Sequence, residues 1–232
     1  MTIVYNTAIV RTGLVLHLDA ANPKSYPGTG TNWTDLSGNS RNGTLINGVG
    51  YNSGSLVFDG TNDHAVVSPY IRSSAFIDRT MSVWFKVNGA NIPGGSSQGL
   101  CSVFDDAEGN PQISMEVNAN GLGVAFNTFY DGTVRGASKV IALNTWYNAV
   151  GIETQTPSRK IQLYVNGVLE AETAAAGTSY SVSATKLNVG CQKVSMNRFF
   201  NGTIGIVQLY ERVLSIQEIA QNFEALRGRF GI

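Results

Sequence analysis

Residues 161–172, IQLYVNGVLEAE, carry the strongest local indication of the fold. Asn166-Gly167 stands between two apolar runs, and both residues tolerate the positive φ angles of a two-residue type I′ turn. The spacing predicts a β-hairpin with two facing pairs, Val165 with Val168 and Tyr164 with Leu169.

Strand-like runs extend outward from this hairpin in both directions. In residues 81–87, MSVWFKV, the alternation predicts Met81, Val83 and Phe85 on one face of a strand. Further strands are predicted at residues 14–18, 56–58, 65–67, 113–117, 122–126, 146–152, 187–189 and 204–210. Many short strands separated by turn residues are typical of a β-sandwich or barrel.

One helix is predicted near the C-terminus. Ser215 and Glu218 have the spacing of a capping box, in which each side chain satisfies a backbone N–H of the first turn. Apolar residues follow at helical spacing to Leu226, and Gly228 is expected to end the helix. The predicted fold class is therefore all-β, an antiparallel two-sheet jelly-roll sandwich with one short C-terminal helix.

Composition excludes several classes of function. Charged residues make up 14% of the 232 residues, against about 25% in an ordinary globular protein. The formal net charge is zero, so the chain lacks the basic excess that nucleic-acid binding needs. No apolar run approaches the ~18 residues of a membrane span. The N-terminus lacks the features of a signal peptide, so we expect a soluble protein made in a cytoplasm.

The two cysteines, Cys101 and Cys191, show no metal-binding spacing. They could form one long-range disulfide. Two buried thiols are favoured, because cysteine packs well as a small apolar residue.

A series of motifs resembles the laminin-G-like, concanavalin A-like lectin/glucanase superfamily. The motifs are GLVLHLDA, DLSGNSRNGTL, SLVFDGTNDHAVV, TMSVWFKVNG, LNTWYNAVGIE, KIQLYVNGVLEAE and FFNGTIGIVQLYERVLSIQEI. The resemblance covers residues 13–225, and it leaves residues 1–12 as an N-terminal arm and residues 226–232 as a C-terminal tail. It implies a jelly roll with one concave sheet and ligands bound by loops along one edge.

The resemblance raises the question of calcium at DGTND, residues 59–63. In calcium-binding members the loop that matches Asn62 and Asp63 supplies part of the metal site. The second such loop reads GCQKVSMN here, without a carboxylate, and the acidic pair of the last strand is replaced by Gly205-Ile206. Calcium takes about six to eight oxygen ligands, so the site is incomplete and no cofactor is expected. DGTND is favoured as a hairpin turn held by its own Asx hydrogen bonds.

The sequence contains no recognisable catalytic motif. Glucanases of this fold use E-x-D-x-x-E, which puts two carboxylates on one face of a strand, and no such pattern occurs. The cluster Asp105, Asp106 and Glu108 reads as a turn, and no nucleophile elbow accompanies His17 or His64. We expect a non-enzymatic protein.

Sugar-binding loops combine an aromatic ring with polar groups. The predicted contacts are Tyr26 in one loop and Tyr130 with Asp131 in another. Phe129, next to Tyr130, and the pair Phe199-Phe200 are further candidates, with the start of the last strand as the alternative role of Phe199-Phe200. Trp33, Trp84 and Trp146 lie in family motifs and are expected in the core.

The two end segments indicate a biological setting. GLVLHLDAANPKSYPGTGT (13–31) and AQNFEALRGRFGI (220–232) are similar to domains in virion proteins of tailed bacteriophages. The favoured hypothesis is a structural component of the virion surface, in head decoration or in the tail or its fibres, bound to other virion proteins and to copies of itself. Residues 2–10, TIVYNTAIV, are expected to add a strand to a neighbour. The alternative is an adhesin that binds a host-surface glycan.

Overall fold

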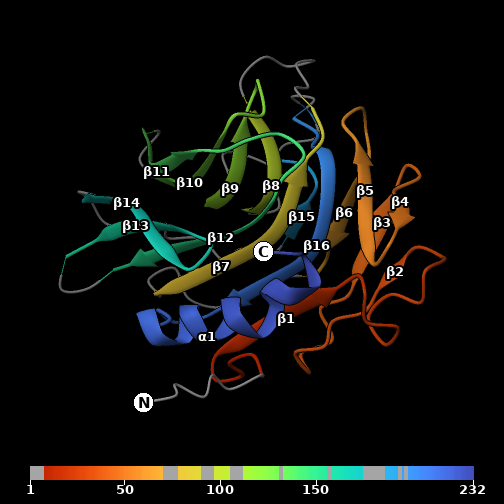
Figure 1. The fold of residues 1–232 in the computed structure, drawn as a ribbon, viewed down its shortest axis with the longest axis horizontal. Coiled ribbons are helices and arrows are strands. Elements are labelled where there is room, and N and C mark those ends of the chain that lie inside the picture. Colours follow the sequence, from red (N-terminus) through yellow and green to blue (C-terminus); the bar gives the residue numbers. More distant parts are fainter. Residues whose placement is uncertain are drawn as a thin grey trace.

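Two eight-stranded antiparallel sheets form the protein (Figure 1). The computed structural model describes residues 8–69, 78–89, 97–104, 112–130, 133–155, 158–174, 186–192, 195 and 198–232. Sheet A has the order β14-β13-β12-β7-β16-β5-β4, with β1 also paired to β16. Sheet B has the order β11-β10-β9-β8-β15-β6-β3-β2. This arrangement confirms the predicted all-β sandwich.

The strand bounds are as follows. Sheet A contains β1 (Leu14–Asp19), β4 (Gly50–Asn52), β5 (Ser55–Asp59), β7 (Arg79–Val87), β12 (Trp146–Thr154), β13 (Lys160–Val165), β14 (Val168–Ala174) and β16 (Asn201–Tyr210). Sheet B contains β2 (Asn32–Trp33), β3 (Gly43–Ile46), β6 (His64–Val67), β8 (Ser97–Phe104), β9 (Ile113–Asn118), β10 (Gly123–Tyr130), β11 (Thr133–Val140) and β15 (Lys186–Val189). Each strand predicted from the sequence is present.

The hairpin between β13 and β14 has the predicted register. Tyr164 faces Leu169 and Val165 faces Val168. The turn residues Asn166 and Gly167 have φ angles of 51° and 80°, as a type I′ turn requires.

The core lies between the two sheets and is built by alternation along the strands. Met81, Val83 and Phe85 of β7 all point into it, as predicted. Trp33 and Phe200 are also fully buried there. Cys101 and Cys191 are buried thiols rather than a disulfide, which confirms that prediction, and burial raises the pKa of the Cys101 thiol.

The DGTND loop differs from its prediction in one respect. Its Asx hydrogen bond is present, because the N–H of Thr61 donates to Oδ1 of Asp59 over 2.7 Å. The hairpin is wrong, since β5 belongs to sheet A and β6 to sheet B. The loop is a corner at which the chain passes between sheets, so the two flanking strands are not paired with each other.

The outer face of sheet A is partly covered by the C-terminal part of the chain (Figure 1). Helix α1 (Ile216–Leu226) begins with the predicted capping box of Ser215 and Glu218. The prediction that Gly228 ends the helix is wrong, because the chain continues into a 3-10 turn, η2 (Arg227–Arg229), that contains this glycine. In the described part of the chain no helix has the length and apolar character of a membrane span.

The described residues at both chain ends pack against this domain. In the N-terminal segment, Val10 donates its N–H to Asn222 Oδ1 over 2.8 Å, and its carbonyl accepts from the Tyr210 hydroxyl over 3.1 Å. In the C-terminal segment, Phe230 stacks on Trp84 with 4.4 Å between ring centres. Residues 8–12 and 226–232 therefore contribute to the packed structure.

Candidate functional site

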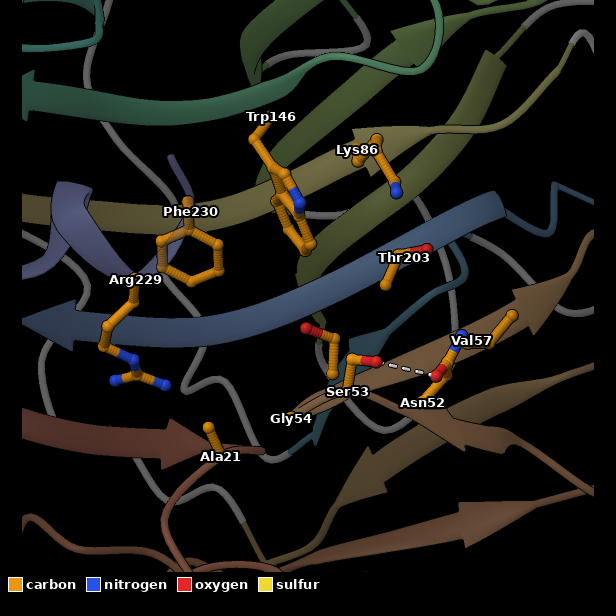
Figure 2. Close-up of a pocket in the computed structure, with 11 residues that line it drawn as sticks. Ala21, Asn52, Ser53, Gly54, Val57, Lys86, Trp146, Thr203, Arg229 and Phe230 are labelled. Atoms are coloured by element: carbon orange, nitrogen blue, oxygen red, sulfur yellow. Dashed lines mark hydrogen bonds between the residues drawn. The ribbon is translucent and has the colours of Figure 1, made fainter. Parts of the chain in front are cut away.

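A pocket opens on the outer face of sheet A where the C-terminal cover ends (Figure 2). Its floor is a cross-strand row, because Trp146 on β12 faces Lys86 on β7, and Lys86 in turn faces Thr203 on β16. Val57 on β5 is the next residue of the row. Since successive side chains of a strand point to opposite faces, the core residues Phe85 and Val87 leave Lys86 on the outside.

The walls come from two segments that are far apart in sequence. On one side is the turn between β4 and β5, with Asn52, Ser53, Gly54 and Ser55, next to Ala21. On the other side are Arg229 and Phe230. The enclosed volume is about 320 Å³, which is near the lower end of the range for small-molecule sites, roughly 300–1,000 Å³.

Phe230 closes the pocket because β16 has a glycine beneath it. A Cβ on Gly205 would lie 2.6 Å from Cε1 of Phe230, closer than atoms can pack. The ring therefore lies flat against the strand and stacks on Trp84, and its centre is 4.7 Å from that of Trp146. Gly205 is one of the two residues that replace the acidic pair of calcium-binding relatives, and here it serves packing.

The pocket is lined by two cations and no carboxylate. Lys86 Nζ lies 5.6 Å from the centre of the half-buried Trp146 ring, within the range of a cation–π contact. Arg229 forms two hydrogen bonds of 2.8 Å with the carboxylate of Asp19 just outside the pocket. The remaining polar lining consists of hydroxyl and amide groups, with Ser53 Oγ donating to Asn52 Oδ1 over 2.9 Å (Figure 2).

A family model described as the concanavalin A-like lectin/glucanases superfamily matches residues 58–220. The chain belongs to this superfamily. The match covers more than half of the sequence and includes the strands that supply Lys86, Trp146 and Thr203.

Solved structures with a similar fold include proteins in complex with SialylT or with sialic acid. The binding domain of botulinum neurotoxin DC in complex with SialylT has a TM-score of 0.71 and 13% identity, with 93% of this chain and 52% of that chain covered. Trypanosoma rangeli sialidase in complex with sialic acid has a TM-score of 0.68 and 16% identity, with 96% and 34% covered. This superfamily chain therefore spans about half of the toxin domain and a third of the sialidase. No curated protein sequence matches it.

The predicted sugar contacts do not meet at this pocket. Tyr26 is 4% exposed, its hydroxyl donates to the carbonyl of Gly30 over 3.0 Å, and Tyr51 packs on its ring. It has no open ring face for stacking. The backbone of Tyr130 ends β10 opposite Thr133, while its side chain and all of Asp131 lie outside the described residues, as does the cluster Asp105, Asp106 and Glu108.

The residues at the family's calcium-binding positions, Asn62 and Asp63, are engaged in hydrogen bonds within the protein. Asp63 is buried and accepts the N–H of Asp59 over 3.3 Å; burial and the Asp59 charge raise the pKa of Asp63. Asn62 is exposed, and its carbonyl oxygen accepts from Asn47 Nδ2 over 3.1 Å. Gln192 in the second loop binds the side chains of Glu116 and Arg198. Among the described residues no three acidic, histidine or cysteine side chains are grouped to hold a metal.

Trp146 is the site residue that sequence reasoning assigned to the core. Trp33 and Trp84 are buried as expected, whereas Trp146 is only half-buried. Trp146 and the core residue Ala149 are three positions apart on β12, so alternation puts them on opposite faces of the strand. Alternation does not indicate what covers the outer face. Lys86 lies two positions after Trp84 and therefore on the same outer face of β7. Its charge is the one feature of the sequence indicating that this face is partly exposed to solvent.

Proposed function

We propose that the chain is a carbohydrate-binding domain that holds a sugar in the pocket floored by Trp146, Lys86 and Thr203, without catalysing a reaction and without calcium. The observation that carries this proposal is the half-buried indole of Trp146 beside hydroxyl and amide groups. The apolar face of a sugar ring stacks on an aromatic ring, and its hydroxyls need donors and acceptors around the rim.

The shape of the pocket supports a small ligand. A volume of about 320 Å³ suits one sugar unit. The fold is shared with proteins whose structures contain SialylT or sialic acid, which supports carbohydrate as the ligand class.

The lining also supports binding over hydrolysis. Glycoside cleavage uses a pair of carboxylates on either side of the bond. None of the 11 residues that line the pocket is Asp or Glu. A sugar held here would meet no group suited to act as its acid or its nucleophile.

The test is a glycan array followed by calorimetric titration of the best ligand. We expect Trp146→Ala to weaken binding about fivefold or more, since stacking of a flat ligand such as a nucleic-acid base on an aromatic side chain is worth roughly 1–3 kcal/mol. Trp146→Phe should retain part of the affinity, and unchanged thermal unfolding will show that both variants are folded. Binding that survives Trp146→Ala but is lost in Tyr130→Ala would overturn the assignment of this pocket.

We further propose that the domain acts at the surface of a tailed-phage virion, in the head or in the tail or its fibres, with copies of itself and other virion proteins as neighbours. The similarity of residues 13–31 and 220–232 to phage virion domains supports this setting. Many copies on one particle would turn weak single-sugar binding into firm attachment.

Mass spectrometry of purified particles tests the setting, which fails if the protein is missing. Removal of residues 2–7 tests the N-terminal segment as a particle contact. Residues 8–12 should be kept, because Val10 is bound to Asn222 and Tyr210 within the domain. Normal incorporation of the shortened protein would contradict a role for this segment.

A further inference from the structure

The pocket has a positive charge that no described neighbour balances. Lys86 forms no salt bridge within the described ranges, although it is half-buried between Trp146 and Thr203. A lysine ammonium has three N–H donors and is strongly hydrated. An ammonium with no carboxylate beside it is free to form charge-assisted hydrogen bonds with a bound anion.

From this feature we infer that the sugar is anionic and that a carboxylate on its ring binds Nζ of Lys86. The inference rests on the proposed function and narrows its substrate class to acidic sugars. The ammonium lies over the indole, 5.6 Å from its centre, so a sugar that enters against Trp146 meets Nζ of Lys86 with its acid group.

The second cation of the pocket supports this assignment indirectly. Arg229 has a carboxylate partner already, and both of its bonds to Asp19 are 2.8 Å long. The pair compensates the negative charge of Asp19 beside the pocket, which reduces its repulsion of an incoming acid. Arg229 thus acts as a positioning residue that fixes the wall, while Lys86 is the ammonium left for the ligand.

The alternative is that Lys86 serves only the cation–π contact with Trp146. Such contacts at exposed positions are worth about 0.5–1 kcal/mol. The ring attracts the positive charge but accepts no hydrogen bond from the three N–H groups of the ammonium. Under this alternative the pocket would treat acidic and neutral sugars alike. A direct comparison of the two kinds of sugar separates the readings.

The experiment is a set of calorimetric titrations at low and high salt. The probes are sialyllactose against lactose, and galacturonic acid oligomers against galactose oligomers. We expect the wild-type protein to prefer one acidic probe over its neutral partner roughly fivefold or more, as an exposed charge pair of about 1 kcal/mol implies. The preference should shrink as salt rises. Which acidic probe binds distinguishes sialic from uronic acid.

Lys86→Gln carries the test, because it keeps a polar side chain only one atom shorter and removes its charge. We expect this variant to lose the preference, so that its affinities for the acidic and the neutral probe become similar. Lys160→Gln is the matched control, since Lys160 lies on β13 in a salt bridge with Glu172, outside the pocket, and it should change nothing.

Two outcomes overturn the inference, and they are distinguishable from each other. Equal affinity for acidic and neutral probes, with both lost in Trp146→Ala, removes the acidic specificity and leaves the sugar site standing. A preference that persists in Lys86→Gln places the anion elsewhere. If no probe responds to Trp146→Ala, the proposed function itself is wrong.

Discussion

Glu153 lies wholly inside the protein between two guanidinium groups. Its carboxylate accepts from Arg79 Nε over 2.6 Å and from Arg159 Nη2 over 2.5 Å, and its side chain is 0% exposed. Burial alone would raise the pKa of Glu153, but the two arginines outweigh it and hold the pKa below its ordinary value. The three residues join the end of β12 to the start of β7 and to the segment before β13.

We expect Glu153→Gln to destabilise the protein by about 3–5 kcal/mol, because removing one member of a buried ionic group leaves uncompensated charge in the interior. Urea unfolding measures the change. Glu172→Gln is the control, since that carboxylate is exposed and binds Lys160 at the surface. A loss below about 1 kcal/mol for Glu153→Gln would contradict the assignment, because that size is typical of exposed pairs.

At the scale of elements, the start of α1 combines a capping box with an ion pair. Ser215 N–H donates to Glu218 Oε2 over 2.8 Å, and both terminal nitrogens of Arg212 bind the same carboxylate at 2.7 and 2.8 Å. The hydrogen bond from Arg212, and then those from Ser215, outweigh partial burial and lower the pKa of Glu218 to about 2. The helix start is therefore tied to the segment after β16.

This pKa predicts a pH dependence of stability. A carboxyl whose folded pKa is lowered stabilises the fold above its unfolded pKa, about 4.3. That contribution is lost as the pH falls from there toward 2. We expect wild type and Glu218→Gln to differ in unfolding free energy at pH 6, and this difference to shrink steadily as the pH falls below about 4 toward 2. Glu224→Gln on the same helix is the control. A constant difference across this range would contradict the prediction.

Elements specified by nearby residues could be predicted from sequence. The turn at Asn166-Gly167 and the cap at Ser215 depend on side chains within a few positions. Strand β11 could not be predicted, because TVRGASKV is polar and becomes a strand only through pairing with β10. The pocket was missed for a related reason. It combines residues of five strands with Phe230, and the ring of Phe230 fits only because Gly205 has no side chain.

At the scale of the whole molecule, two sheets pack face to face on one core. The core between them is continuous, and the corner at DGTND is held by hydrogen bonds within the loop. Backbone N–H groups of Thr61, Asn62 and Asp63 outweigh slight burial and lower the pKa of Asp59. The Asp59 carboxylate is thus engaged with the backbone of its own loop.

We therefore expect calcium to leave stability unchanged. A ligand that binds only the folded state raises the melting temperature, and the rise grows with the ratio of ligand concentration to Kd. Calorimetric scans with millimolar calcium and with a chelator should give the same Tm. The matched variant Asp63→Asn should behave alike in both conditions, and sugar binding should also persist in the chelator. A calcium-dependent rise in Tm that Asp63→Asn abolishes would contradict this expectation.

The position of the last residue affects how the protein should be handled in the laboratory. The carbonyl of Ile232 accepts from Arg227 Nη1 over 3.1 Å, so the chain end is held only two residues beyond Phe230. An affinity tag or fluorescent protein joined after Ile232 would emerge beside the pocket and shield it. Immobilisation through that end would present the blocked face to every ligand. A negative binding screen on a C-terminally tagged sample would report on the tag, and cleaving it should restore the signal.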